Sequence, residues 1–198
     1  MRLTYKTITT PTQTEFKDRG SKFIGFAFQV NTTEEIKANL QALKKEHPKA
    51  NHHCYAYRLG TEGLQYRAND DGEPSGSAGR PILGQIDSAE LTNILIVVVR
   101  YFGGTLLGVP GLINAYKNCA NDCLSSAIIT EKNIEHRIVL DFDYSLMNDV
   151  MMILKQNDAT IYKQDMQLFC IFEIGIPLIN KDVALERLKD IRGVEIKS

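Results

Sequence analysis

Three carboxylates lie close together in the segment NDDGEPSGSAGRPIL at residues 69–83: Asp70, Asp71 and Glu73. Carboxylates at this spacing can hold a divalent cation such as Mg²⁺ beside a ligand phosphate, or act as general bases. An EF-hand is excluded, because Pro81 stands where that loop needs its glutamate. The alternative is structural, since NDDG is typical of a turn whose side chains bond nearby backbone.

A second candidate site follows NILIVVVRYF at residues 93–102, the most apolar stretch of the chain. We expect this stretch to be a central strand. The glycine-rich GGTLLGVPG comes next and leads into a helix, an order that builds anion sites from loop amides and a helix N-terminus. Gly103 and Gly104 would let a ligand approach the backbone, and Arg100 and Lys117 flank the loop. Neither the P-loop nor the dinucleotide fingerprint matches, so a tight packing turn is the alternative.

Histidines and cysteines offer a weaker candidate, the NHHC run at residues 51–54. On a strand His52 and Cys54 share one face, so the run supplies at most two metal ligands. Cys119 and Cys123 share a helical face, but that face is apolar and no CxxC pair exists. We therefore expect buried thiols, no metal site and no cofactor.

The spacing of apolar residues predicts an α+β protein of two domains. In the N-terminal part we expect strands over 22–30 and 52–59, a helix over 33–47 with a capping box at Thr32 and Glu35, and a short helix beginning at Pro81. From about residue 133 the expected order is strand, helix, strand, strand, helix, strand. That order is the split βαβ, ferredoxin-like pattern.

Composition limits the classes of function. The 198 residues are 43% hydrophobic and 24% charged, with a net charge of −1, and neither half is strongly basic. Charge alone therefore does not predict nucleic-acid binding. No apolar run approaches the roughly 18 residues of a membrane span, and no signal peptide is evident, so we expect a cytoplasmic protein with no membrane partner. Four cysteines fit reduced thiols in that compartment.

Three stretches together carry a resemblance to a known family: HHCYAYRLG, NDDGEPSGSAGRPIL and VVVRYFGGTLLG, in that order. With them the chain resembles the IMPACT family, most closely its bacterial YigZ-type members, over essentially its whole length. The resemblance implies a domain over 1–130 similar in fold to the second domain of a ribosomal small-subunit protein. It also implies a ferredoxin-like domain over 131–198 similar to domain V of elongation factor G.

The resemblance implies a role in translation. Eukaryotic relatives regulate translation by binding a large activator protein and so restraining a kinase of an initiation factor, with an additional N-terminal domain that this sequence lacks. Our hypothesis is a non-enzymatic cytoplasmic protein that binds RNA, the ribosome or a translation factor through a groove in the first domain. The expected contacts are Arg80, Arg100, Tyr101 and Lys117, and the groove would also include Asp70, Asp71, Glu73, Gly103 and Gly104.

The alternative hypothesis is a nucleotide- or phosphate-binding enzyme. It would use the loop from Gly103 to Gly111 for phosphate, and the three carboxylates with Mg²⁺. The loop departs from the family pattern where Pro110 replaces a glycine and Asn114 replaces a basic residue. Proline removes a donor amide and asparagine removes a cation, so both changes weaken an anion site here. The sequence does not choose the ligand or the oligomeric state.

Overall fold

The computed structural model describes residues 2–197. Contacts between residues divide the chain into two compact units. The N-terminal unit is Tyr5–Lys132, and the C-terminal unit begins at Asn133 and includes the first residues of the chain up to Thr4. Among the described residues, no helix is long and apolar enough to cross a membrane.

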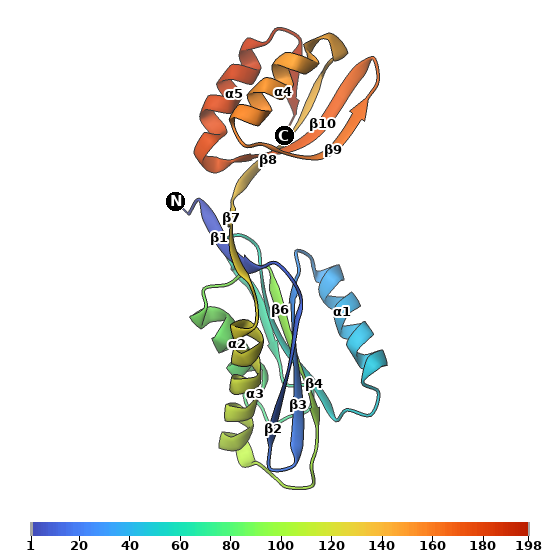
Figure 1. Cartoon of the computed structure of the whole chain (residues 1–198), viewed down its shortest axis with the longest axis vertical. Helices are drawn as coiled ribbons and strands as arrows, with labels where there is room; N and C mark the ends of the chain where they lie inside the picture. The colour runs from blue at the N-terminus through green and yellow to red at the C-terminus, as the bar shows by residue number, and fades with distance from the viewer. Residues whose placement is uncertain (1, 198) are drawn as a thin grey trace. The chain divides into compact units, whose positions relative to one another are not determined.

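A five-stranded antiparallel sheet forms the centre of the N-terminal unit (Figure 1). Its order is β2 (Thr12–Asp18), β3 (Ser21–Gln29), β6 (Ile94–Tyr101), β4 (His52–Leu59) and β5 (Gln65–Asn69). The apolar stretch is therefore the central strand, as its composition predicted, and every residue of β6 before Tyr101 is buried. A separate pair of strands joins β1 (Thr4–Ile8) to β7 (Ile129–Asn133).

Helices cover both faces of this sheet (Figure 1). α1 (Thr33–Glu46) packs on one face, and α2 (Gly79–Ser88) and α3 (Gly108–Ser125) pack on the other. Because side chains alternate along a strand, neighbouring residues of β6 enter different cores. Val97 and Val99 pack with α1, whereas Ile96 and Val98 pack with α2 and α3.

Local sequence signals explain where two of the helices begin. Thr32 accepts a hydrogen bond from the Glu35 amide at 3.2 Å, and the Glu35 carboxylate accepts one from the Asn31 amide at 2.7 Å. This is the expected capping arrangement of α1, with the return bond displaced by one residue. α2 begins two residues before Pro81, which is tolerated because amides of a first helical turn have no intrahelical partner.

The C-terminal unit has the element order predicted for it. β8 (Glu135–Asp143), α4 (Met147–Gln156), β9 (Thr160–Met166), β10 (Phe169–Pro177), α5 (Lys181–Asp190) and β11 (Val194–Lys197) follow one another, with short 3₁₀ turns η1 (Tyr144–Leu146) and η2 (Leu178–Asn180) before the helices. The sheet order is β11-β8-β10-β9, all antiparallel. This is the topology of the split βαβ pattern. Its core includes Leu140, Phe142 and Phe172.

Candidate binding pocket

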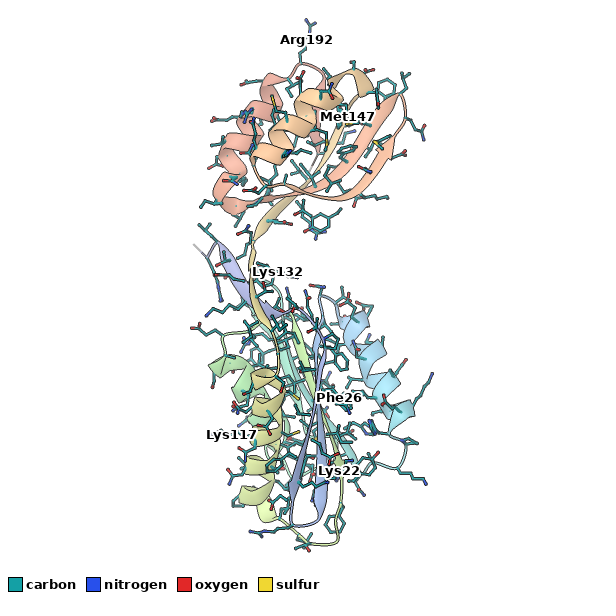
Figure 2. All side chains as sticks on the ribbon, viewed as in Figure 1. Lys22, Phe26, Lys117, Lys132, Met147 and Arg192 are labelled. Carbon is teal, nitrogen blue, oxygen red and sulfur yellow. The ribbon has the colours of Figure 1, made fainter. Side chains whose placement is uncertain are left out.

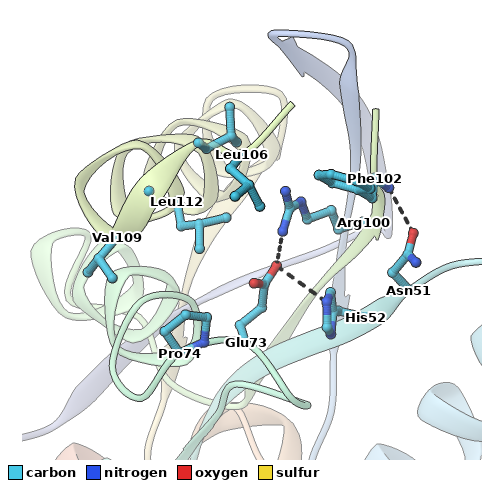
Figure 3. Close-up of a pocket in the computed structure, with 11 residues that line it drawn as sticks. Asn51, His52, Glu73, Pro74, Arg100, Phe102, Leu106, Val109 and Leu112 are labelled. Atoms are coloured by element: carbon cyan, nitrogen blue, oxygen red, sulfur yellow. Dashed lines mark hydrogen bonds and ion pairs between the residues drawn. The ribbon is translucent and has the colours of Figure 1, made fainter. Parts of the chain in front are cut away.

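A pocket of about 450 Å³ lies in the N-terminal unit, where the end of β6, the beginning of β4, the loop after β5 and the start of α3 meet (Figure 3). Its polar lining comes from Asn51, His52, Glu73 and Arg100. Its apolar lining comes from Pro74, Phe102, Leu106, Leu107, Val109 and Leu112. The volume is in the range of small-ligand sites, and a mostly apolar wall with a few polar groups is typical of them.

A buried ion pair forms the polar floor of this pocket. The Arg100 guanidinium donates through Nη1 to Glu73 Oε1 at 2.6 Å, and the two side chains are only 6% and 4% exposed (Figure 3). The hydroxyl of Tyr116, on α3, donates to the same Oε1 at 2.8 Å. Burial without such partners would be unfavourable for either charge. Glu73 is therefore held from two elements, β6 and α3.

Arg100 keeps unused donor capacity. Its second contact, from Nη2 to Ser21 Oγ, is long at 3.4 Å, and its buried Nε has no hydrogen-bond partner among the described residues. The guanidinium carbon lies 5.5 Å from the ring centre of Phe23 and 5.6 Å from that of Phe102. The cation thus lies near two aromatic rings, and among the described residues its Nε–H is left without an acceptor.

Asp70 and Asp71 hold the loop that carries Glu73. The Asp70 carboxylate accepts bonds from the amides of Gly76 at 2.9 Å, Ala78 at 3.0 Å and Gly79 at 2.8 Å, so it caps the start of α2 from across the loop. Burial of the carboxyl works against its ionisation, but these amides outweigh it and lower the pKa of Asp70. Asp71 accepts a bond from the His53 amide at 2.7 Å.

His52 adds a nitrogen to the pocket. Its Nδ1 lies 2.8 Å from the carbonyl oxygen of Asp71, and a carbonyl only accepts, so this nitrogen carries a proton. Its Nε2 lies 3.9 Å from Glu73 Oε1 (Figure 3). The loop thereby fixes both the ring orientation and the tautomer of His52.

The two adjacent glycines of the loop after β6 have different roles. A Cβ on Gly103 would lie 1.9 Å from the backbone carbon of Gly20, so this position packs against the turn between β2 and β3. Gly104 has a φ of +87° and open space around it. For Gly103 the packing-turn alternative therefore explains the glycine, and for Gly104 the left-handed backbone explains it.

The matched sequence region contains this whole pocket. The sequence model described as the Impact N-terminal domain matches residues 19–124. The chain belongs to the IMPACT family. It is 35% identical to the IMPACT family member YigZ of Escherichia coli (strain K12) over 79% of this chain and 78% of that protein. It is 37% identical to an IMPACT family member of Haemophilus influenzae over 79% of this chain and 77% of the relative.

A solved structure supports the same fold over the whole chain. The crystal structure of a hypothetical protein superposes with a TM-score of 0.78 at 29% identity, covering 100% of this chain and 98% of the other. The agreement extends through both units, so the two-unit α+β architecture is shared with this solved structure.

The structure brings together only part of the site expected from the sequence. Glu73 and Arg100 contact each other in the pocket. Asp70 and Asp71 do not line it, and their hydrogen bonds instead hold the loop that forms one of its walls. Tyr101 points to the other face of the sheet, where its hydroxyl lies 2.9 Å from His47 Nδ1. Arg80 is exposed at the beginning of α2.

Lys117 also lies apart from the pocket lining. It is exposed on the outer side of α3, away from the sheet (Figure 2). Sequence reasoning missed His52, Phe102 and Tyr116 as parts of this site. The sequence gives little sign that Tyr116 belongs to the pocket, because its spacing on α3 indicates only a buried core position. Its ring is buried, and its hydroxyl group reaches Glu73.

Burial sets the acidity of two side chains beside the pocket. Burial raises the pKa of the Cys54 thiol and of the Tyr116 hydroxyl, so neither is a ready nucleophile. Among the described residues, no group of three or more histidine, cysteine and acidic side chains is arranged to hold a metal ion. The pocket is an apolar cavity with the Glu73–Arg100 ion pair fixed at its floor, where Arg100 has spare donors.

Proposed function

We propose that this protein is a non-enzymatic regulator in translation, and that its pocket holds a protein component of the translation machinery, such as a translation factor or a ribosomal protein. The translational part rests on membership of the IMPACT family, because the resemblance described in the sequence analysis implies that its eukaryotic members regulate translation. The observation that carries the choice of partner is the pocket lining. Among the described residues that line it, Arg100 is the one Lys or Arg, it is already paired with a buried carboxylate, and most of the remaining wall is apolar.

A protein segment suits this lining better than an RNA backbone does. RNA-binding surfaces gather unpaired Lys and Arg side chains that reach phosphates. Here Arg80 and Lys117 are exposed on two different helices and outside the pocket. Exposed apolar side chains at the pocket mouth, Phe102, Leu106 and Val109, are instead what a protein partner covers.

The enzyme alternative is less well supported. Three backbone amides occupy the Asp70 carboxylate, and Arg100 and Tyr116 occupy Glu73. Both oxygens of Asp70 already accept amide hydrogen bonds, and the Arg100 cation beside Glu73 opposes the binding of Mg²⁺ there. Pro110 also leaves the first turn of α3 without one amide donor.

An affinity pull-down from native lysate tests the proposal, with nuclease-treated and untreated samples in parallel. The informative variant is Leu106→Asp, which places a charge on a pocket residue that is 82% exposed. Its matched control is Leu64→Asp, because Leu64 is equally exposed, at 81%, and is not part of the pocket.

We expect the wild type and the Leu64→Asp variant to recover a translation factor or ribosomal protein that Leu106→Asp loses. Recovery should survive nuclease. If nuclease removes all recovered translational material, the partner is RNA and the protein-binding proposal is wrong. If no component of translation is recovered, the translational role is wrong as well.

A further inference from the structure

We propose that the pocket recognises a polypeptide C-terminus: the terminal carboxylate at its polar floor and an apolar last side chain against its wall. This inference rests on the proposed function and names the group of the partner that the pocket would bind. It follows from three features of the pocket, namely the unused donors, the apolar wall and the exposed side chains at the mouth.

The unused donors come first from Arg100. Only 6% of this side chain is exposed, and yet its Nε has no partner among the described residues. The contact of Nη2 with Ser21 is long at 3.4 Å. A guanidinium offers donors side by side in one plane, which is the geometry that a carboxylate accepts. The ion pair with Glu73 uses only the Nη1 side of this plane.

Further donors come from the beginning of α3. Leu107, Gly108 and Val109 line the pocket, and in the described part of the chain no side-chain cap is found at this end of the helix. Amides of a first helical turn have no partner within the helix, and the helix dipole favours negative charge there. Pro110 has no N–H, so the amide donors of this first turn are those of Leu107, Gly108 and Val109, and all three residues line the pocket. Together with Arg100 they suit a small anionic head such as a carboxylate.

The wall and the mouth define the rest of the ligand. Leu107 and Leu112 are buried and Pro74 lies beside Glu73, so a group placed next to the carboxylate contacts apolar surface. Leu106, Phe102 and Val109 continue this apolar surface outward and are exposed. A free amino acid bound at the polar floor would leave this rim uncovered. A chain that continues out of the pocket would cover it, which favours a polypeptide over a free small acid.

The polar acceptors at the floor fit the same ligand. His52 lines the pocket on the side of β4, whereas the side-chain carbonyl of Asn51 is already used, because it accepts a hydrogen bond from the Phe102 amide at 2.8 Å. Both hydrogen bonds to Glu73 end on Oε1, so among the described residues no donor is found for Oε2. The last amide N–H of a bound peptide, which lies beside its carboxylate, is a donor of the kind that Oε2 or His52 would accept.

A titration followed by NMR on the ¹⁵N-labelled full-length chain tests this inference. The probe is a pool of hexapeptides with five randomised positions and leucine at the C-terminus. The comparison probes are the same pool with an amidated C-terminus, and N-acetyl-leucine. The backbone amides of Gly108 and Val109, and the Nε–H of Arg100, are the signals to follow, since each belongs to a proposed donor.

We expect the free-carboxylate pool to shift these three signals and to bind at least tenfold more tightly than the amidated pool. N-acetyl-leucine should shift the same signals but bind at least tenfold more weakly than the pool. Equal binding of the free and amidated pools would overturn the carboxylate assignment. Equal binding of N-acetyl-leucine would overturn the polypeptide assignment, and no shift from any probe at millimolar concentration would overturn both.

Two variants of one exposed residue, Val109, distinguish a loss of carboxylate binding from a folding defect. Val109→Glu adds a carboxylate at the helix start, where it favours the helix but repels a bound carboxylate. Val109→Gln has nearly the same shape without the charge. We expect Val109→Glu to weaken binding of the free-carboxylate pool at least tenfold relative to Val109→Gln, with the two proteins equally folded. Equal binding by the two variants would count against a carboxylate at this place.

If the pull-down still depends on Leu106 while these peptide tests fail, the proposed function stands and only the C-terminus inference falls.

Discussion

Removing either member of the Glu73–Arg100 pair is expected to destabilise the N-terminal unit strongly. Each side chain is less than a tenth exposed, so the remaining charge would stay buried without its counter-ion. Such losses cost about 3–5 kcal/mol. We therefore expect Glu73→Met and Arg100→Met each to lower the free energy of unfolding by about that amount.

The double variant Glu73→Met/Arg100→Met distinguishes the pair from two independent side chains. With both charges removed, neither is left unpaired, and the double variant should cost much less than the sum of the single variants. Tyr116→Phe is the matched control, since it keeps the ring and both charges and removes one bond to Glu73 together with the weak bond that the hydroxyl accepts from the Cys54 thiol. We expect it to cost about 1.5–3 kcal/mol, the range for hydrogen bonds to charged groups.

Hydrogen exchange measured by mass spectrometry across a urea series reports each unit separately. Protection in β4 and β6 should fall in both single variants, while protection in β8 and β10 should stay unchanged. The reasoning would be refuted if each single variant cost less than about 1 kcal/mol, as for an exposed pair, or if the double variant cost the full sum.

Three further predictions concern the supports of the pocket and the buried thiols. Gly103→Ala should lower the melting temperature far more than Gly104→Ala, because its Cβ would lie 1.9 Å from the Gly20 backbone; the second change costs only the strain of a left-handed residue, about 1 kcal/mol. Asp70→Asn should cost about 1–2 kcal/mol at neutral pH, in the range for helix caps. Because the folded state lowers the pKa of Asp70, its ionised form stabilises the fold above the ordinary value of 3.8, and this contribution is lost as the pH falls through the folded value. Urea unfolding between pH 7 and pH 2 should therefore show a weaker acid dependence in the variant. Burial raises the pKa of the Cys123 thiol to about 11, so this thiol should react with Ellman's reagent at pH 8 only after denaturant is added.

Each of these predictions has a contrary result. Equal melting temperatures for the two glycine variants would contradict the close backbone approach. An unchanged acid dependence in Asp70→Asn would show that its carboxylate does not cap α2. Rapid reaction of Cys123 in the native protein would show that this part of α3 opens readily.

Most of the fold could be predicted because its signals are local. Alternating or continuous apolar runs marked β4, β6, β8 and β10, and Thr32 with Glu35 marked the start of α1. The short edge strand β2 was missed, since Thr12–Asp18 is largely polar and only its partner β3 reveals it as a strand.

The site was only partly predictable, for reasons of geometry. The two-residue period of a strand already separates Arg100 from Tyr101, so their different faces could have been inferred from the sequence. The meeting of Glu73 with Arg100 could not, because it depends on the register that pairs His52 with Arg100 and on the path of the loop after β5. Neither is encoded in local spacing.

The double anchoring of the loop after β5 has a consequence for the speed of recognition. Asp70 ties this loop to the start of α2, and Asp71 ties it to β4, so Glu73 and Pro74 between them are in place before any ligand arrives. A preorganised wall leaves little chain entropy to lose on association. Binding should then proceed without a slow rearrangement step, and differences in affinity among ligands should arise chiefly from how long each complex lasts.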